Sequence, residues 1–206
     1  MNARRRKALR DAPPQGVAKV LALWRARRAS KALIDRIRGE IIAASRRPAL
    51  YAALDAPDRM DGRFEMLTLH AGLILRRLMS IGGLGHDVAQ DLVNSLFMHF
   101  DDSLREMALS DIAVSKRLKS IKEAFYGRNA AYASALDSGA RAELEAALAR
   151  NVYGANRETA PKAAGLAEYV ASIEASLAAT SLEDFTSGRF RFPEGPIASG
   201  GQRAGS

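Results

Sequence analysis

Apolar residues recur at three- and four-residue intervals along most of this 206-residue chain, and this recurrence limits the possible folds more than any other feature. Such spacing places side chains on one face of an α-helix, which then has to be buried against other helices. No strand-like alternation of any length is present, and the helix formers Ala, Leu, Arg and Glu dominate. The sequence therefore predicts an all-α fold, a single multi-helix bundle with about six main helices.

One segment, Gly62 to Met79, is apolar on nearly all sides, which predicts a helix in the middle of the bundle. The glycines after Ile81 are expected to end it, because glycine tolerates positive φ. Asp61, Asp87 and either Ser110 or Asp111 are candidate N-caps. The one-sided stripes, each predicting one further helix, are Leu33, Ile34, Ile37 and Ile41; Val88, Leu92, Leu96, Phe100, Leu104 and Met107; Val114, Leu118, Ile121, Phe125 and Tyr132; Leu144, Leu148 and Val152; and Leu166, Tyr169, Val170, Ile173 and Leu177.

The ends of the chain differ from this body. Residues 1–30 are predicted to form a basic N-terminal arm, partly disordered and partly amphipathic, with a short apolar stripe from Val17 to Trp24 that ends at Arg28. A separate helix is expected after Arg28, ending before Pro48. Residues 31–180 are expected to form the helical domain, and residues 181–206 an irregular, flexible C-terminal tail.

The positive charge is concentrated in the arm. Residues 1–47 carry 14 Lys and Arg against 3 acidic residues, whereas residues 48–206 carry 17 against 20. A DNA-binding domain normally carries its charge on the folded surface, so DNA is not expected as a partner. Clustered basic residues beside an apolar stripe favour a tether to an anionic membrane surface or a ribosome. The residues expected to form this tether are Arg4, Arg5, Arg6, Trp24, Arg25 and Arg28.

Few of the usual catalytic arrangements are present. The chain has no cysteine, which excludes disulfides and thiolate chemistry, and it has no phosphate-binding loop or nucleophile elbow. His70 is interpreted as a core histidine, although an acid/base role is the alternative. His99 and Asp102 have a spacing that metals use, but no second pair completes a site. We therefore expect no enzyme activity, no metal and no cofactor; a small enzyme that uses His70 or His99 is the competing hypothesis.

A basic ridge is predicted on one helix, where Lys116, Lys119 and Lys122 are three residues apart. The simplest interpretation is a solvated helix face. The alternative is a contact for acidic protein, lipid headgroups or RNA, so a ribosome- or RNA-binding module is the second functional hypothesis.

Several sequence blocks resemble the ubiquinol–cytochrome c chaperone family. They occur in the order of that family and extend over roughly residues 35–175. The blocks are Asp61-Gly62-Arg63-Phe64-Glu65-Met66-Leu67-Thr68-Leu69-His70, Leu75-Arg76-Arg77-Leu78, Leu96-Phe97, Asp101 to Met107, Asp111 to Lys116, Glu123 to Arg128, and Ala149 to Tyr153.

The resemblance implies an all-helical assembly chaperone for the respiratory ubiquinol–cytochrome c reductase. Mitochondrial members act on newly made cytochrome b near the ribosome exit, so the implied partner is cytochrome b or its nascent chain. The expected location is the bacterial cytoplasm, peripheral to the inner membrane, with the mitochondrial matrix as the alternative. Polar and aromatic residues in the blocks that a helix core does not require are predicted to bind the client protein, gathered on one surface beside an apolar groove. These residues are Arg63, His70, Arg76, Arg77, Arg105, Lys116, Lys119, Tyr126 and Arg128.

Overall fold

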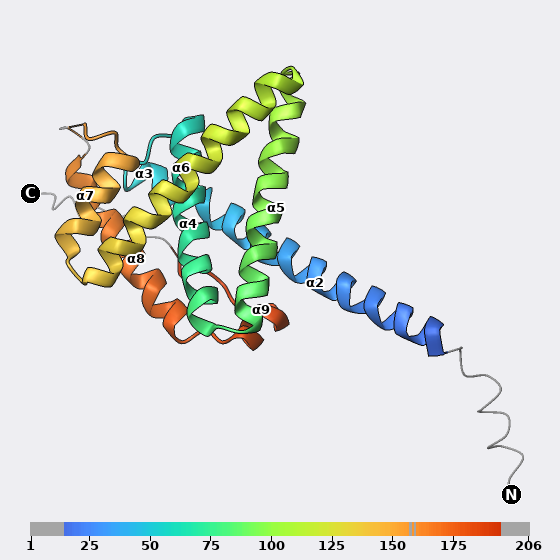
Figure 1. Cartoon of the computed structure of the whole chain (residues 1–206). Coiled ribbons are helices and arrows are strands. Elements are labelled where there is room, and N and C mark those ends of the chain that lie inside the picture. Colours follow the sequence, from blue (N-terminus) through green and yellow to red (C-terminus); the bar gives the residue numbers. More distant parts are fainter. Residues whose placement is uncertain (1–14, 157, 159, 195–206) are drawn as a thin grey trace, which may run out of the picture.

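The structure of the protein is a computed structural model that describes residues 15–156, 158 and 160–194, with only the backbone for residues 15–28 and 160. All regular structure in these residues is helical, as the sequence predicts (Figure 1). The elements are α2 (Gln15–Ser45), α3 (Pro48–Ala52), α4 (Met60–Ile81), α5 (Leu84–Glu106), α6 (Asp111–Ser138), α7 (Arg141–Asn151), the 3-10 turn η1 (Ala160–Lys162), α8 (Ala163–Ala178) and α9 (Leu182–Ser187).

Helix α4 is the centre of the bundle. It contacts α2, α5, α6 and α8, and the other long helices surround it (Figure 1). Its side chains are buried on several faces, including those of Leu69, Leu73, Ile74 and Leu78. The expectation that the all-round apolar segment occupies the middle of the bundle is therefore confirmed.

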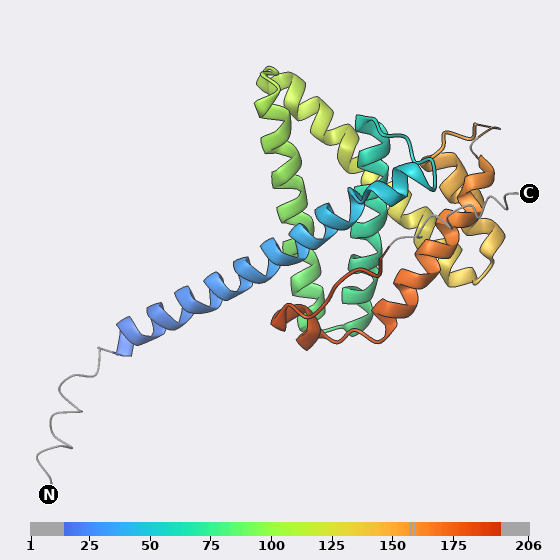
Figure 2. The ribbon, with the colours of Figure 1, turned by 180° about the vertical axis from the view of Figure 1, so that it is seen from behind.

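Helix α2 is continuous from Gln15 to Ser45, so the two helices predicted on either side of Arg28 are one. The apolar stripe changes face near Arg28, but the residues there are good helix formers and none is proline, so the backbone continues without a break. The second half buries Leu33, Ile37 and Ile41 against the bundle. The first half extends away from the other helices in both views (Figures 1 and 2).

The helix ends follow the sequence in part. Ser110 caps α6, as its side-chain oxygen accepts a hydrogen bond from the backbone N–H of Ala113 at 3.3 Å. Asp61 and Asp87 are not caps, because α4 and α5 begin before these residues. Both carboxylates lie in the first turn of their helix, where the positive end of the helix dipole stabilises a negative charge. Gly82 ends α4 with a φ of 71°, as expected.

The segment after α8 differs from the irregular tail that the sequence predicts. Residues Leu182–Ser187 form α9, and Phe185, Phe190 and Phe192 are buried. The guanidinium of Arg47 donates hydrogen bonds to the backbone oxygens of Phe192, at 3.1 Å, and of Pro193. Three phenylalanines without helical spacing give no periodic signal, although each is large enough to fix a non-helical segment on the core.

Candidate protein-binding site

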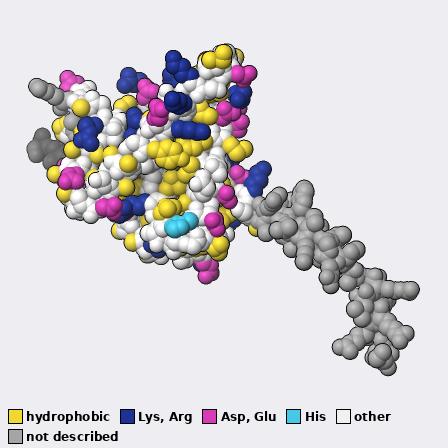
Figure 3. Space-filling view, viewed as in Figure 1, with side chains coloured by type: hydrophobic (Ala, Val, Ile, Leu, Met, Phe, Trp, Pro, Cys, Tyr) yellow, Lys and Arg dark blue, Asp and Glu magenta, His cyan; other side chains and the backbone are white. Residues whose placement is uncertain are grey.

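A groove lies between α5 and α6, which converge at the tip of a hairpin and diverge towards the rest of the bundle (Figure 1). It is open to solvent and has a volume of about 460 Å³. Hydrophobic side chains gather on this face of the molecule, with Lys and Arg side chains above them (Figure 3). The groove is lined by Val93, Asn94, Phe97, Met98, Asp101 and Asp102 from α5 and by Leu118, Lys122 and Tyr126 from α6.

Aromatic rings form the floor of the groove. Phe97 packs edge-on against the buried Phe125, with ring centroids 5.4 Å apart, and lies 5.9 Å from Tyr126. Above this floor, Met98 and Tyr126 are 66% and 54% exposed, so their side chains are available to a partner. An aromatic floor with an adaptable methionine is typical of surfaces that bind apolar segments of other proteins.

Charged groups border the apolar lining. Asp101 forms an ion pair with Arg105 at 2.7 Å, and Arg105 also contacts Asp111 at 2.9 Å, which joins the end of α5 to the start of α6. On the opposite wall, the Lys122 ammonium lies 5.3 Å from the centroid of the Phe97 ring. The two walls therefore carry opposite charges.

The tip of the α5–α6 hairpin extends the apolar surface. Met107, Leu109 and Ile112 are all exposed, Ile112 to 84%. The sequence assigns Met107 to the buried stripe of α5, and this assignment is wrong because the helix ends at Glu106, beyond the reach of the bundle. Ala108, which lies between Met107 and Leu109, has a φ of 54°, a left-handed conformation that is unfavourable for a residue with a Cβ.

Only Tyr126, among the predicted client-binding residues, lines the groove, and Arg105 borders it through Asp101. Lys116 and Lys119 are exposed on α6. Arg63 is exposed and pairs with Asp58 at 2.7 Å, before the start of α4.

Three of the predicted arginines hold helices together. The Nε of Arg128 donates to Oε1 of the buried Glu65 at 2.6 Å, and its guanidinium lies over the Phe64 ring, 5.7 Å from the centroid. Burial raises the pKa of Glu65, and the hydrogen bond from Arg128 offsets part of that rise. This pair fastens α6 to α4.

Arg76 and Arg77 have similar roles further along α4. Arg76 pairs with Asp137 of α6 at 2.7 Å and with Glu174 of α8 at 3.3 Å. The Nε of Arg77 donates to the backbone oxygen of Thr180 at 2.9 Å. Both arginines are engaged in these contacts within the bundle. Packing between helices therefore explains why they occur in the family-like sequence blocks.

His70 is completely buried, so the prediction that it contacts a client is wrong. Its Nδ1–H donates to the backbone oxygen of Met66 at 2.7 Å, and its Nε2 accepts from the Tyr169 hydroxyl at 3.0 Å. Burial lowers the pKa of His70 to about 4, which keeps the ring neutral. The interpretation as a core histidine with a hydrogen-bonded ring fits this geometry.

His99 is half-buried, and its pKa is lowered mainly by burial and further by Arg38 and Arg46. Within the described ranges, no group of three His, Asp or Glu side chains could hold a metal ion. The tether residues are not tested: Arg4, Arg5 and Arg6 lie outside the described residues, as do the side chains of Trp24, Arg25 and Arg28 on α2.

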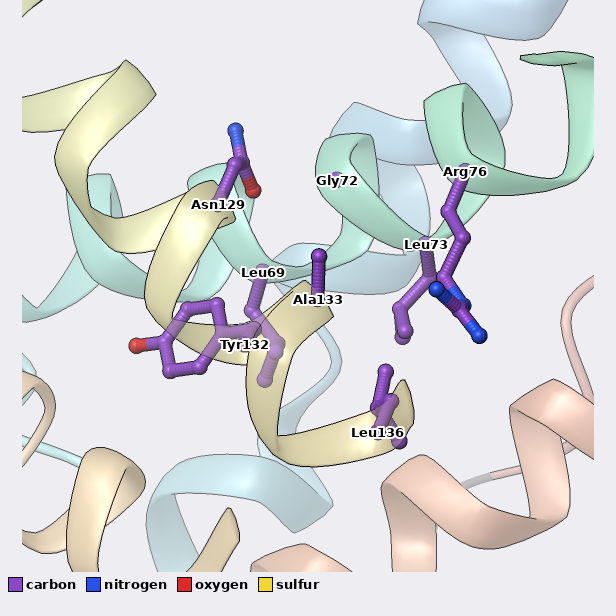
Figure 4. A pocket seen from close by; sticks show the side chains of 8 residues that line it. All are labelled: Leu69, Gly72, Leu73, Arg76, Asn129, Tyr132, Ala133 and Leu136. Carbon is purple, nitrogen blue, oxygen red and sulfur yellow. The ribbon is translucent and has the colours of Figure 1, made fainter. Parts of the chain in front are cut away.

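A second, much smaller cavity lies between α4 and α6 (Figure 4). Its volume of about 20 Å³ is enough for one water molecule but not for an organic ligand. Gly72 is required beside it, because a Cβ at that position would lie 1.9 Å from Oδ1 of Asn129. This cavity reflects the close packing of two helices, and the α5–α6 groove is the larger candidate site.

Most of the groove could not be assigned from the sequence. Val93, Phe97 and Met98 are apolar positions of α5 that fall outside its buried stripe, and this second stripe is the signal that could have identified them. The signal does not say whether a second apolar face is covered by another helix or left open.

An open groove with an aromatic floor on an all-helical bundle defines this chain as a candidate protein-binding module, since a site for a small molecule normally encloses its ligand. The chain belongs to the ubiquinol-cytochrome C chaperone family, which matches residues 52–192. The resemblance seen in the sequence is therefore confirmed, and family membership supports a chaperone role.

A solved structure agrees with this assignment. The chain is similar to the crystal structure of the Cbp3 homolog from Brucella abortus, with 35% sequence identity and a TM-score of 0.75. The match covers 85% of this chain and 97% of the Brucella chain. No curated protein sequence matches this chain. None of the described helices is long and apolar enough to cross a membrane.

Proposed function

We propose that this protein is an assembly chaperone of the ubiquinol–cytochrome c reductase that binds newly made cytochrome b in the α5–α6 groove. The observation that carries the proposal is the open groove, with its aromatic floor and charged rim, on a member of this chaperone family. Newly made membrane proteins expose apolar segments that aggregate in water, and an apolar groove covers part of that surface. The chain needs no chemistry of its own for this task.

Two exposed methionines allow a matched test. Met98 lies in the groove and Met79 lies near the end of α4, and their side chains are 66% and 54% exposed. Replacing Met98 with Glu places a charge in the client's apolar path, whereas Met79→Glu changes the same residue type outside the groove. We expect Met98→Glu to reduce the capture of freshly translated cytochrome b about tenfold or more and Met79→Glu to leave it nearly unchanged.

Both variants should keep melting temperatures within a few degrees of the unmodified protein, because exposed substitutions change stability little. Capture of cytochrome b by Met98→Glu at the unmodified level would place the client elsewhere. Failure of the unmodified protein to capture cytochrome b would refute the proposed function itself.

A ribosome- or RNA-binding role is the second candidate. It is supported by the exposed Lys116, Lys119 and Lys122 on α6 and by the basic residues of the arm. It predicts sedimentation with ribosomes that falls steeply with salt and is lost when Lys116 and Lys119 are replaced with Glu. Sedimentation that is independent of salt and of these lysines would exclude it.

The proposed location is the bacterial cytoplasm beside the inner membrane, with the basic arm as the tether. Changing Arg4, Arg5 and Arg6 to Glu in the full chain should reduce binding to anionic liposomes, because each basic residue near an anionic surface contributes about 1 kcal/mol of attraction. Equal liposome binding by this variant and the unmodified protein would mean that the arm is not a membrane tether.

A further inference from the structure

The two walls of the α5–α6 groove differ in charge. Asp101 and Asp102 lie on the α5 wall, and Lys122 lies on the α6 wall. Arg105 offsets the charge of Asp101, whereas Asp102 and Lys122 form no ion pair within the part of the chain that the structure describes. A partner that enters the groove therefore meets one carboxylate and one ammonium on opposite sides.

The lining residues also have a regular spacing. Val93, Phe97 and Asp101 follow one another at four-residue intervals on α5, and Leu118, Lys122 and Tyr126 do so on α6. Rows of this kind are the ridges along which a third helix packs. From Val93 to Asp101 the α5 row is about 12 Å long, which accommodates about two turns of a partner helix.

A peptide strand that binds by extending a sheet does not fit this surface, because the groove is formed by two helices and has no sheet edge. An anionic membrane surface would need positive charge on both walls. The combination of aromatic floor, a ridge of regularly spaced residues on each wall and opposite charges suits an amphipathic helix with charged residues on both sides of its apolar face.

We infer that the groove binds an amphipathic helix of the client preferentially in one direction, set by Asp102 and Lys122. A basic side chain on one flank of the helix contacts Asp102, and an acidic side chain on the other flank contacts Lys122. Turning the helix end for end would exchange the flanks and place like charges together. The inference rests on the proposed function for the identity of the client, but the rule for direction concerns the groove alone.

The absence of cysteine from the chain makes direction measurable. A single cysteine is introduced at either end of the groove: Asn94→Cys on α5, away from the hairpin tip, or Ser115→Cys on α6, near it. The probe is a designed amphipathic peptide of about 16 residues with Leu on one face, Lys on one flank, Glu on the other and a thiol-reactive group at its N-terminus. A second peptide has Lys and Glu exchanged.

Each peptide should cross-link preferentially to one cysteine, and the two peptides should prefer opposite ends. Two weak, exposed ion pairs that both change from attraction to repulsion should give a preference of about fourfold or more. The doubly reversed protein, Asp102→Lys with Lys122→Glu, should invert both preferences. Higher salt should weaken them without changing their sign.

Equal cross-linking at both ends, a preference that survives charge reversal, or no binding of either peptide would overturn the inference. Self-association of the protein that competes with the peptides would identify a second copy as the occupant and would also overturn it. Capture of translated cytochrome b is measured with the same protein. Capture without directional preference refutes only the inference, whereas directional preference without capture refutes only the proposed function.

Discussion

Replacing Arg128 with Met would leave Glu65 without its partner. The side chain of Glu65 is only 6% exposed, and Arg128 Nε lies 2.6 Å from its Oε1. Breaking a fully buried ion pair costs about 3–5 kcal/mol, and the value should be at the low end here because Arg128 is partly exposed. A loss of about 3 kcal/mol corresponds to a fall of about 6–12 °C in melting temperature for a chain of this size.

The loss should depend on pH with a definite sign. Burial already raises the pKa of Glu65, and removing Arg128 takes away the group that opposes this rise. An acid with a raised folded-state pKa binds more protons when folded than when unfolded, so stability falls as pH increases through the interval between the two pKa values. Thermal melts of Arg128→Met should therefore show a smaller deficit near pH 5 than near pH 8.

Two further variants test the cause. Glu65→Leu combined with Arg128→Met removes both charges and should recover most of the stability at pH 8. Arg63→Met removes an arginine from an exposed pair and should change the melting temperature by only about 1–2 °C. An Arg128→Met protein that melts like the unmodified one, or with the same deficit at both pH values, would refute this reasoning.

Three other changes separate packing from binding. Tyr126→Ala should reduce cytochrome b capture about tenfold or more with little effect on the melting temperature, since Tyr126 is exposed in the groove; early melting with intact capture would assign it to the fold. Gly72→Ala should destabilise by about 1–3 kcal/mol in denaturant unfolding, because its Cβ would meet Asn129, and Asn129→Ala should relieve the clash; an unrelieved loss would mean that another contact is responsible. His70 is neutral when buried and charged when unfolded below its usual pKa, so stability should fall by about 3 kcal/mol as pH drops from 6.5 to 4; a His70→Phe variant with the same pH slope would exclude His70 as the cause.

The core could be predicted from the sequence because burial follows helical spacing. Leu92, Leu96 and Leu104 are buried as their four-residue intervals predict, and α4 is central because few of its sides are polar. Helical spacing shows which residues share a face of a helix, but it does not show what a polar residue beside that face contacts. It could not separate Arg128, which holds α4 and α6 together, from Tyr126, which faces solvent two positions earlier.

The groove and the final segment needed information that no local pattern contains. Whether the second apolar stripe of α5 is covered depends on where α6 runs, and the direction of α6 is set by contacts with α4 over long sequence distances. Phe190 and Phe192 are buried but belong to a segment without regular structure, so neither helical nor strand periodicity marks them.

The anchoring of the last segment has a consequence for biosynthesis. Arg47 holds the backbone of Phe192 across 145 residues, and the Phe192 ring packs on His70 with centroids 5.1 Å apart. Contacts between segments so distant in sequence form late, because the chain between them has to be made and ordered first. Until the segment around residues 190–193 has left the ribosome, α2 and α4 lack this cover over His70. A chain broken off before Phe190 should therefore remain a loosely packed and protease-sensitive species, even though every long helix has already been synthesised.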